Sequence, residues 1–169
     1  HIKNGDQSYH LSNSSLRCGL QLENHYIMGS SDHHIRILNK DFSVHKSWKA
    51  HDNSVFGLAY LGHDVLASAG RDARIKLWDL KSYRELMSLD AHLYQVTSLA
   101  YRNGLLLSSS MDKSLRIWSD ELDLLKVADP IRDNGHSNCV NRVCWLNDSM
   151  FVSSSDDRSL IIWEIEKIG

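Results

Sequence analysis

The chain has 169 residues, which is enough to bury one hydrophobic core, and its hydrophobic share of 42% is ordinary for a globular protein. Its formal net charge of −2 indicates neither a basic face for nucleic acid nor an acidic disordered tail, and no apolar run reaches the ~18 residues that span a membrane. The three cysteines, Cys18, Cys139 and Cys144, form no CxxC pair, which favours reduced thiols and a cytoplasmic or nuclear location.

An internal repeat organises the chain. Four segments show it, namely Tyr26–Leu38, Val65–Trp78, Leu105–Trp118 and Met150–Trp163. In each segment an Asp lies six residues before the last position, and these residues are Asp32, Asp72, Asp112 and Asp157. Their separations are 40, 40 and 45 residues. A small residue followed by His precedes three of them by 20 or 21 residues, at Ala50-His51, Ala91-His92 and Gly135-His136.

These segments have the pattern of β-strands, because Gly and Ser interrupt every apolar run before a helical stripe can form. Each repeat is expected to begin with an inner strand, as at 55–60, 96–101 and 140–145. A second strand rich in small residues and a third strand ending near Trp follow it. A less regular outer strand completes the repeat, near 44–48, 85–89 and 122–127. The sequence therefore predicts an all-β fold.

With these features the chain resembles the WD40-repeat family, whose repeats are ~40–45 residues long. Trp78-Asp79 keeps the Trp–Asp pair of the family, Trp118-Ser119 and Trp163-Glu164 are degenerate forms, and Leu38-Asn39 lacks it. The resemblance implies a β-propeller whose blades are four-stranded antiparallel sheets. Four blades are expected, at about 11–48, 51–89, 92–128 and 136–166, the last without an outer strand of its own.

The resemblance gives the repeated His, Ser, Asp and Trp a structural role. The Asp orients the His, the His contacts a Ser of the second strand, and the Ser reaches the indole N–H of the Trp. The three sets are His51, Ser68, Asp72 and Trp78, then His92, Ser108, Asp112 and Trp118, then His136, Ser153, Asp157 and Trp163. A Ser–His–Asp catalytic site is the alternative, but it would have to occur three times, and no GxSxG elbow is present.

The first repeat departs from this pattern. Met28 stands at the Ser position, Leu38 stands at the Trp position, and His10 is only a loose candidate for the His. We therefore expect a softer blade that is held by packing alone. Either Ser15 or Leu16 begins its inner strand.

Four repeats are too few to close a ring of this family, in which seven blades are most common. We expect the chain to be an incomplete portion of a seven- or eight-bladed ring, and the C-terminal half of a longer protein. An unclosed stack exposes apolar faces, so the remaining blades or a second copy are the expected cover. Rings of the family close by pairing an N-terminal strand with the last blade, and Ile2-Lys3 offers a short one.

The resemblance also places three positions of each repeat on the upper surface of the propeller: the third and fifth residues after the His, and the residue before the Asp. They are Ser54, Phe56 and Arg71, then Gln95, Thr97 and Met111, then Cys139, Asn141 and Asp156, with Ser31 before the Asp of the first repeat. Phe56, Arg71 and Met111 stand out, because an aromatic ring, a guanidinium and a thioether suit an interface hot spot. We expect this surface to bind a protein partner.

The expected function is a non-catalytic scaffold. A substrate receptor of a ubiquitin ligase is one alternative, but it calls for a WDxR run where Trp78-Asp79-Leu80-Lys81 has Lys for Arg. A ribonucleoprotein assembly factor is another, although the basic residues are scattered, which argues against nucleic acid as a partner. No cofactor or metal is expected, because no phosphate-binding loop is present and the adjacent His33 and His34 point to opposite faces of a strand.

Overall fold

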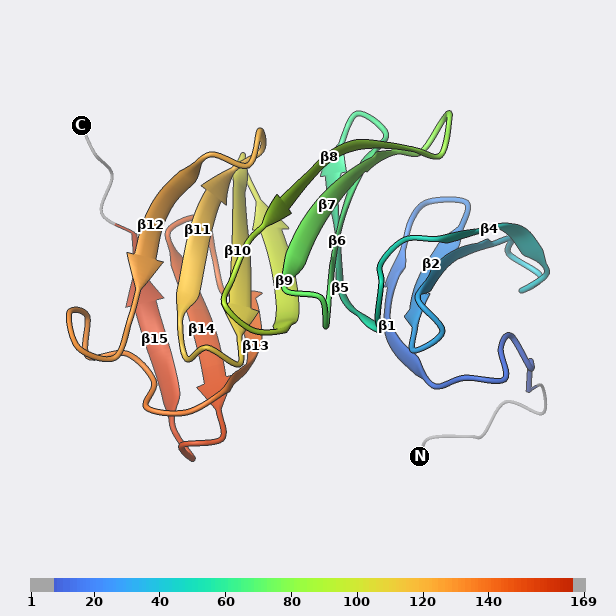
Figure 1. Cartoon of the computed structure of the whole chain (residues 1–169). Coiled ribbons are helices and arrows are strands. Elements are labelled where there is room, and N and C mark those ends of the chain that lie inside the picture. Colours follow the sequence, from blue (N-terminus) through green and yellow to red (C-terminus); the bar gives the residue numbers. More distant parts are fainter. Residues whose placement is uncertain (1–7, 166–169) are drawn as a thin grey trace, which may run out of the picture.

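The computed structural model describes residues 8–165, which form four antiparallel sheets (Figure 1). Blade 1 contains β1 (Leu16–Gln21), β2 (Tyr26–Ser30), β3 (His34–Leu38) and β4 (Val44–Lys49). Blade 2 contains β5 (Val55–Gly62), β6 (Val65–Gly70), β7 (Arg74–Asp79) and β8 (Arg84–Asp90). Blade 3 contains β9 (Val96–Arg102), β10 (Leu105–Ser110), β11 (Leu115–Ser119) and β12 (Leu124–Ala128). Blade 4 contains β13 (Val140–Trp145), β14 (Met150–Ser155) and β15 (Leu160–Glu164).

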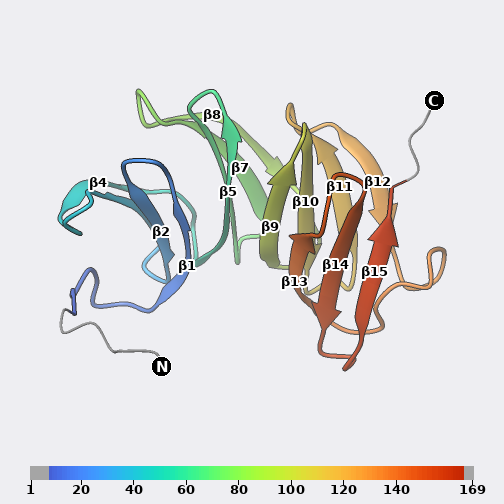
Figure 2. The same cartoon turned by 180° about the vertical axis from the view of Figure 1, so that it is seen from behind.

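The blades stand side by side in an arc, with blade 1 and blade 4 at its two ends (Figures 1 and 2). Within each blade the strands are hydrogen-bonded in chain order, so every connection is a simple antiparallel turn. The inner strands are neighbours from blade to blade: β1 contacts β5, β5 contacts β9, and β9 contacts β13. This arrangement confirms the predicted all-β fold of propeller type.

Three apolar clusters lie between the blades, and strand alternation explains them. Successive side chains of a strand point to opposite faces of its sheet. On β6, Leu66 therefore packs toward blade 1, while Ala67 and Ala69 pack toward blade 3. The small residues let neighbouring sheets approach closely, and larger side chains such as Ile75 and Leu106 fill the remaining space.

The turn between the second and third strands has the same construction in all four blades. The residue after the repeated Asp has a positive φ, between 65° and 75°, at His33, Ala73, Lys113 and Arg158. The Asp carboxylate accepts a hydrogen bond from the backbone N–H two residues later, which offsets the cost of this left-handed residue. The Asp is therefore fixed in position before it meets any other side chain.

The two ends of the arc differ. On blade 1, Leu38 is only 1% exposed, and the aromatic rings of Tyr9, Phe42 and Tyr26 lie one beside the next, with centroids 4.7 and 5.0 Å apart. On blade 4, Leu160 and Ile162 are 64% and 57% exposed. The next residue, Trp163, points to the other face of the strand and belongs to the core shared with blade 3. The outward face of blade 4 is therefore apolar and uncovered in the described part of the chain.

Blade 4 has three strands among residues 8–165. The proposed closing strand at Ile2-Lys3, and the expected end of the last blade at residue 166, lie outside the described residues. Within the described range, the structure has no helix long and apolar enough to cross a membrane.

Candidate functional site

The repeated His, Ser, Asp and Trp are brought together in blades 2, 3 and 4. In blade 3, His92 Nδ1 lies 2.9 Å from Asp112 Oδ2 and its Nε2 lies 2.8 Å from Ser108 Oγ, which accepts a hydrogen bond from Trp118 Nε1 at 2.9 Å. In blade 2 the His51–Asp72, His51–Ser68 and Trp78–Ser68 distances are 2.9, 2.7 and 2.8 Å. In blade 4 the His136–Asp157, His136–Ser153 and Trp163–Ser153 distances are 3.0, 2.7 and 2.8 Å.

A neutral imidazole satisfies every group in such a set. Its Nδ1–H donates to the carboxylate, its Nε2 accepts the Ser O–H, and the Ser oxygen accepts the indole N–H. The environment of blade 3 favours this state, because burial lowers the pKa of His92 and outweighs the opposing effect of Asp112. Burial also opposes the charge on Asp112, but its hydrogen bonds to His92 and Ser114 prevail and lower the pKa of that carboxyl.

The same geometry shows why the hydroxyl groups are poor nucleophiles. Ser68 and Ser108 are 0% exposed and Ser153 is 1% exposed, so a substrate has no path to their oxygens. Each oxygen already accepts a hydrogen bond from an indole N–H. A Ser–His–Asp nucleophile needs an accessible hydroxyl beside an oxyanion hole.

Blade 1 has a polar network of its own, and the expectation that packing alone holds it was wrong. Asp32 Oδ2 binds Arg36 at 2.5 Å and accepts a hydrogen bond from Ser12 Oγ at 2.9 Å. Ser30 Oγ bonds to Asp32 Oδ1 and to the same guanidinium. The Arg36 hydrogen bond lowers the pKa of Asp32. Arginine on β3 thus takes the place of the His, while His10 is exposed and Ser12 is the partner from the N-terminal segment.

A β-bulge recurs at one position of every inner strand. At this position the register skips Arg17 of β1, Phe56 of β5, Thr97 of β9 and Asn141 of β13, and β5 has a second skip at Leu61. We call these four residues the bulge row. A bulge leaves its extra residue unpaired and redirects that side chain, and bulges are common beside functional sites.

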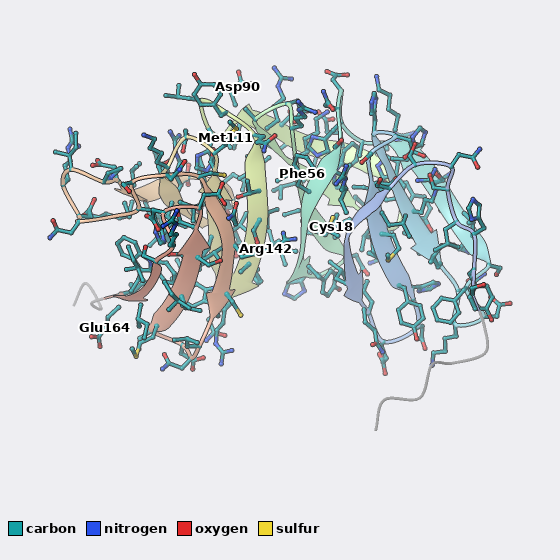
Figure 3. All side chains as sticks on the ribbon, turned by 90° about the horizontal axis from the view of Figure 1, so that it is seen from below. Cys18, Phe56, Asp90, Met111, Arg142 and Glu164 are labelled. Carbon is teal, nitrogen blue, oxygen red and sulfur yellow. The ribbon has the colours of Figure 1, made fainter. Side chains whose placement is uncertain are left out.

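The bulge row lines one hollow of about 340 Å³, together with Leu16, Gln95 and Arg142. A second hollow of about 270 Å³ shares Arg17, Phe56 and Arg142 and continues along the inner strands to Cys18 and Leu99. We call the two hollows the channel. Figure 3 shows Phe56, Cys18 and Arg142 close to where the inner strands of the arc face one another. Burial raises the pKa of the Cys18 thiol to about 12, so this cysteine lies in the channel as an unreactive neutral group.

Contacts between blades fix the channel wall. The Arg17 guanidinium lies 5.9 Å from the centre of the Phe56 ring, and its Nε donates to Ser31 Oγ at 2.6 Å. Thr97 Oγ1 lies 2.5 Å from the carbonyl oxygen of Val140, and the carbonyl of Thr97 accepts a hydrogen bond from Arg142 Nη1 at 3.1 Å. Blades 3 and 4 are thus joined in both directions at the channel.

The residues expected on the upper surface do not all lie there. We call the end of the blades that carries the His loops and the turns after the second strands the top face. Arg71, Met111 and Asp156 are exposed on it, and Phe56, Gln95, Thr97 and Asn141 are half-buried in the channel wall. Ser54 was wrongly expected to be exposed. It is buried where two loops cross, and its carbonyl oxygen accepts a hydrogen bond from the backbone N–H of Arg71.

Four residues were missed from the sequence. Arg17 and Arg142 line the channel, and Leu93 and Tyr94 are 81% and 61% exposed beside Met111 on the top face. The two loops that carry this apolar patch are linked by the hydrogen bond from Met111 N to Gln95 O. Arg17 is the blade 1 counterpart of Phe56. It lies 15 residues before Asp32, as Thr97 lies 15 residues before Asp112, so counting back from the Asp would have found it without a His. No group of three His, Cys, Asp or Glu residues in the described chain is arranged to hold a metal ion.

Comparison with known families decides the relationship. The family model described as "WD domain, G-beta repeat" matches residues 42–79, 83–119 and 129–164, together more than half of the chain. The chain belongs to the WD40-repeat family. The first two matched stretches each contain the outer strand of one blade and three strands of the next. One sequence repeat therefore spans parts of two neighbouring blades. β1, β2 and β3 lie outside the matches, in agreement with the degenerate first repeat.

Curated relatives are WD-repeat proteins of greater length. The probable cytosolic iron-sulfur protein assembly protein 1 of Kluyveromyces lactis is 31% identical over 136 residues, which cover 73% of this chain and 40% of that protein. Ribosome biogenesis protein YTM1 of the same organism is 31% identical over 72% of this chain and 30% of its own length. The serine-threonine kinase receptor-associated protein of Mus musculus is 32% identical over 68% of this chain and 32% of its own length. The chain thus spans less than half the length of these relatives.

Solved structures share the fold at low sequence identity. The computationally designed Ika4 protein superimposes with a TM-score of 0.81 at 22% identity, over 98% of this chain and 100% of that one. The computationally designed Ika8 protein superimposes with a TM-score of 0.77 at 22% identity, over 91% of this chain and 47% of that one. The four-blade arc thus matches the whole of one designed protein and about half of another.

Proposed function

We propose that this WD40 chain is a non-catalytic scaffold that docks a protein partner on its top face, at the mouth of the channel. The observation that carries the proposal is the bulge row. Four blades present the side chains of the bulge row to one hollow, and a concave surface to which several elements contribute side chains is the usual form of a binding site. The adjoining Leu93, Tyr94 and Met111 supply exposed apolar area of the kind found at interface hot spots.

A binding role also accounts for the groups that resemble catalysts. The buried His, Ser, Asp and Trp sets tie the loops of the top face to the strands below, for example through the hydrogen bond from Leu93 N to Asp112. Rigid loops lose little conformational entropy when a partner binds. In this proposal the sets hold the interface in shape and take no part in a reaction.

The names of the relatives support a role in building protein complexes. Two of them are named for assembly or biogenesis and one for association with a receptor kinase. We place the chain in the cytoplasm or the nucleus, in line with a relative named as cytosolic and with three free cysteines. Its partners in this proposal also include the blades, or the second copy, that cover blade 4.

Ribonucleoprotein assembly is the second candidate, because one relative is named for ribosome biogenesis. A protein surface remains the first choice, since the net charge is −2. The ubiquitin-ligase alternative gains nothing from the structure. Lys81, which stands where the motif requires Arg, pairs with Asp64 at 2.9 Å on an exposed loop.

Affinity capture from cell extract tests the scaffold. The wild-type chain is compared with a triple variant, Phe56→Ala, Arg71→Glu and Met111→Ala, and with the control Ile131→Ala, whose side chain is 91% exposed on a loop. We expect the triple variant to lose at least 10-fold of the proteins captured by the wild type, at an unchanged midpoint of thermal unfolding, while the control captures them fully. Equal capture by all three chains would refute binding at the top face.

A further inference from the structure

The channel carries two arginines and no acidic residue. Arg17 and Arg142 line both hollows, and neither lining contains Asp or Glu. Within residues 8–165 neither guanidinium forms an ion pair, whereas Arg36, Arg74 and Arg102 each bind an Asp at 2.9 Å or less. The concave surface thus carries two positive charges with no ion-pair partner among the described residues, in a chain whose net charge is −2.

Both guanidinium groups are held in position but keep donors for a ligand. Arg17 uses its Nε for Ser31 and lies against the Phe56 ring, and Arg142 uses one Nη1 hydrogen for the carbonyl of Thr97. An arginine has five N–H donors, so several on each side chain have no protein partner among the described residues. A fixed planar guanidinium binds a carboxylate or a phosphate through two parallel hydrogen bonds.

We propose that the channel binds an anionic side chain of the partner protein, held between Arg17 and Arg142. This inference rests on the proposed docking function and specifies its chemistry. The upper hollow, of about 340 Å³, has room for one or two side chains, and its mouth adjoins Gln95, which directly follows the exposed Tyr94. The fitting segment therefore carries an acidic or phosphorylated residue near an apolar one.

A polynucleotide fits these observations less well. Non-specific binding of a single strand uses a basic groove along several nucleotides. Here the basic residues of the channel are two, and Asp156 lies at its rim, bonded to Asn141 at 2.6 Å. A short acidic segment needs only the one concave site.

Fluorescence anisotropy with labelled hexapeptides tests the proposal on the whole chain. The peptides share one Leu and differ in two positions, which are Glu, phosphoserine, Gln or Lys, and a hexauridylate is the nucleic-acid probe. We expect the Glu or the phosphoserine peptide to bind at least 10-fold more tightly than the Gln and Lys peptides, and the binding to weaken with salt. Whichever of the Glu and phosphoserine peptides binds more tightly shows whether a carboxylate or a phosphate of the partner enters the channel.

The variants are Arg17→Gln, Arg142→Gln, Arg142→Lys and Arg142→Glu, with Arg84→Gln on the outer strand β8 as the matched control. We expect Arg17→Gln and Arg142→Gln each to lower the affinity for the anionic peptides roughly 10-fold or more, because each removes a charge-assisted hydrogen-bonded pair. The affinity for the anionic peptides should fall less in Arg142→Lys, and Arg142→Glu should bind the Lys peptide more tightly than the anionic ones. Arg84→Gln should bind all the peptides as the wild type does. Thermal unfolding of each variant shows that it is folded.

Three results would overturn the inference: equal binding of the Glu, phosphoserine and Gln peptides, no effect of either arginine, or preference for hexauridylate. Its failure is separable from that of the scaffold. If the arginine variants capture partners from extract normally while the Phe56, Arg71 and Met111 variant does not, docking stands and the anionic contact is wrong. If the wild type captures no partner that the triple variant loses, docking itself fails.

Discussion

At the scale of single residues, one serine hydroxyl in each of blades 2, 3 and 4 joins the most distant parts of a repeat. Ser108 on β10 contacts His92, which lies before β9, and Trp118 near the end of β11. All three polar groups are buried, so each depends on the others for a hydrogen-bond partner. The network is therefore worth more than its single bonds, because removing the hydroxyl leaves two further groups unsatisfied.

Ser108→Ala measures this dependence. The substitution leaves the Trp118 N–H without its acceptor and His92 Nε2 without its donor, and we expect unfolding to require about 2–4 kcal/mol less free energy. Ser88→Ala is the control. The Ser88 hydroxyl is buried on β8 with no hydrogen-bond partner in the described chain, so its removal should change the free energy by less than about 0.5 kcal/mol or stabilise the fold. Denaturant titration gives both values, and similar losses in the two variants would contradict a special role for Ser108.

At the scale of elements, the blades show what sequence can and cannot predict. The strands and turns of blades 2, 3 and 4 were predictable, because local alternation and a fixed Asp specify them within one repeat. The network of blade 1 was not, since it uses Arg36 on the third strand and Ser12 before the first strand in place of a His. A motif search looks for the same residue at the same position, and it overlooks a different side chain that reaches the same carboxylate.

The channel was only partly predictable for the same reason. Phe56, Thr97 and Asn141 could be found by counting from a His. Arg17 has no His before it and is found only by counting back from Asp32, and Arg142 lies one residue beyond the bulge, where the family pattern assigns nothing. Their shared place appears only when the inner strands of blades 1 and 4 are brought to one hollow.

Arg36→Met tests whether blade 1 depends on its substituted network. The change removes the ion pair with Asp32, whose two side chains are 13% and 26% exposed, and we expect the free energy of unfolding to fall by about 1 kcal/mol. Amide exchange in β1, β2 and β3 should quicken more than in blade 3, because the loss is local. Arg74→Met is the control, since its pair with Asp90 is 44% and 78% exposed and should contribute almost nothing. Equal exchange in both variants would mean that packing alone holds blade 1.

At the scale of the whole molecule, the two ends of the arc differ in the apolar surface that they expose. On blade 1, Leu38 is buried, and Tyr26 across the strand pair from it belongs to an aromatic group that includes Tyr9 from the segment before β1. On blade 4, Cys144, Val152 and Ile162 are aligned across the three strands by the sheet register, and Leu160 lies on the same face of β15. In a ring this face would pack against another blade, as the inward faces of blades 2 and 3 do.

Self-association of the isolated chain measures the open end. A contiguous apolar face drives association, whereas a single exposed apolar residue does not. We expect the wild type to show an apparent mass that rises with concentration in sedimentation equilibrium, and the double variant Leu160→Asn and Ile162→Thr to shift this rise to at least 10-fold higher concentration. Ile131→Thr, which removes a solitary exposed isoleucine from a loop, should associate as the wild type does. A wild-type chain that stays monomeric at 19.3 kDa over the whole concentration range would show that blade 4 needs no cover, and that the arc is stable with one bare face.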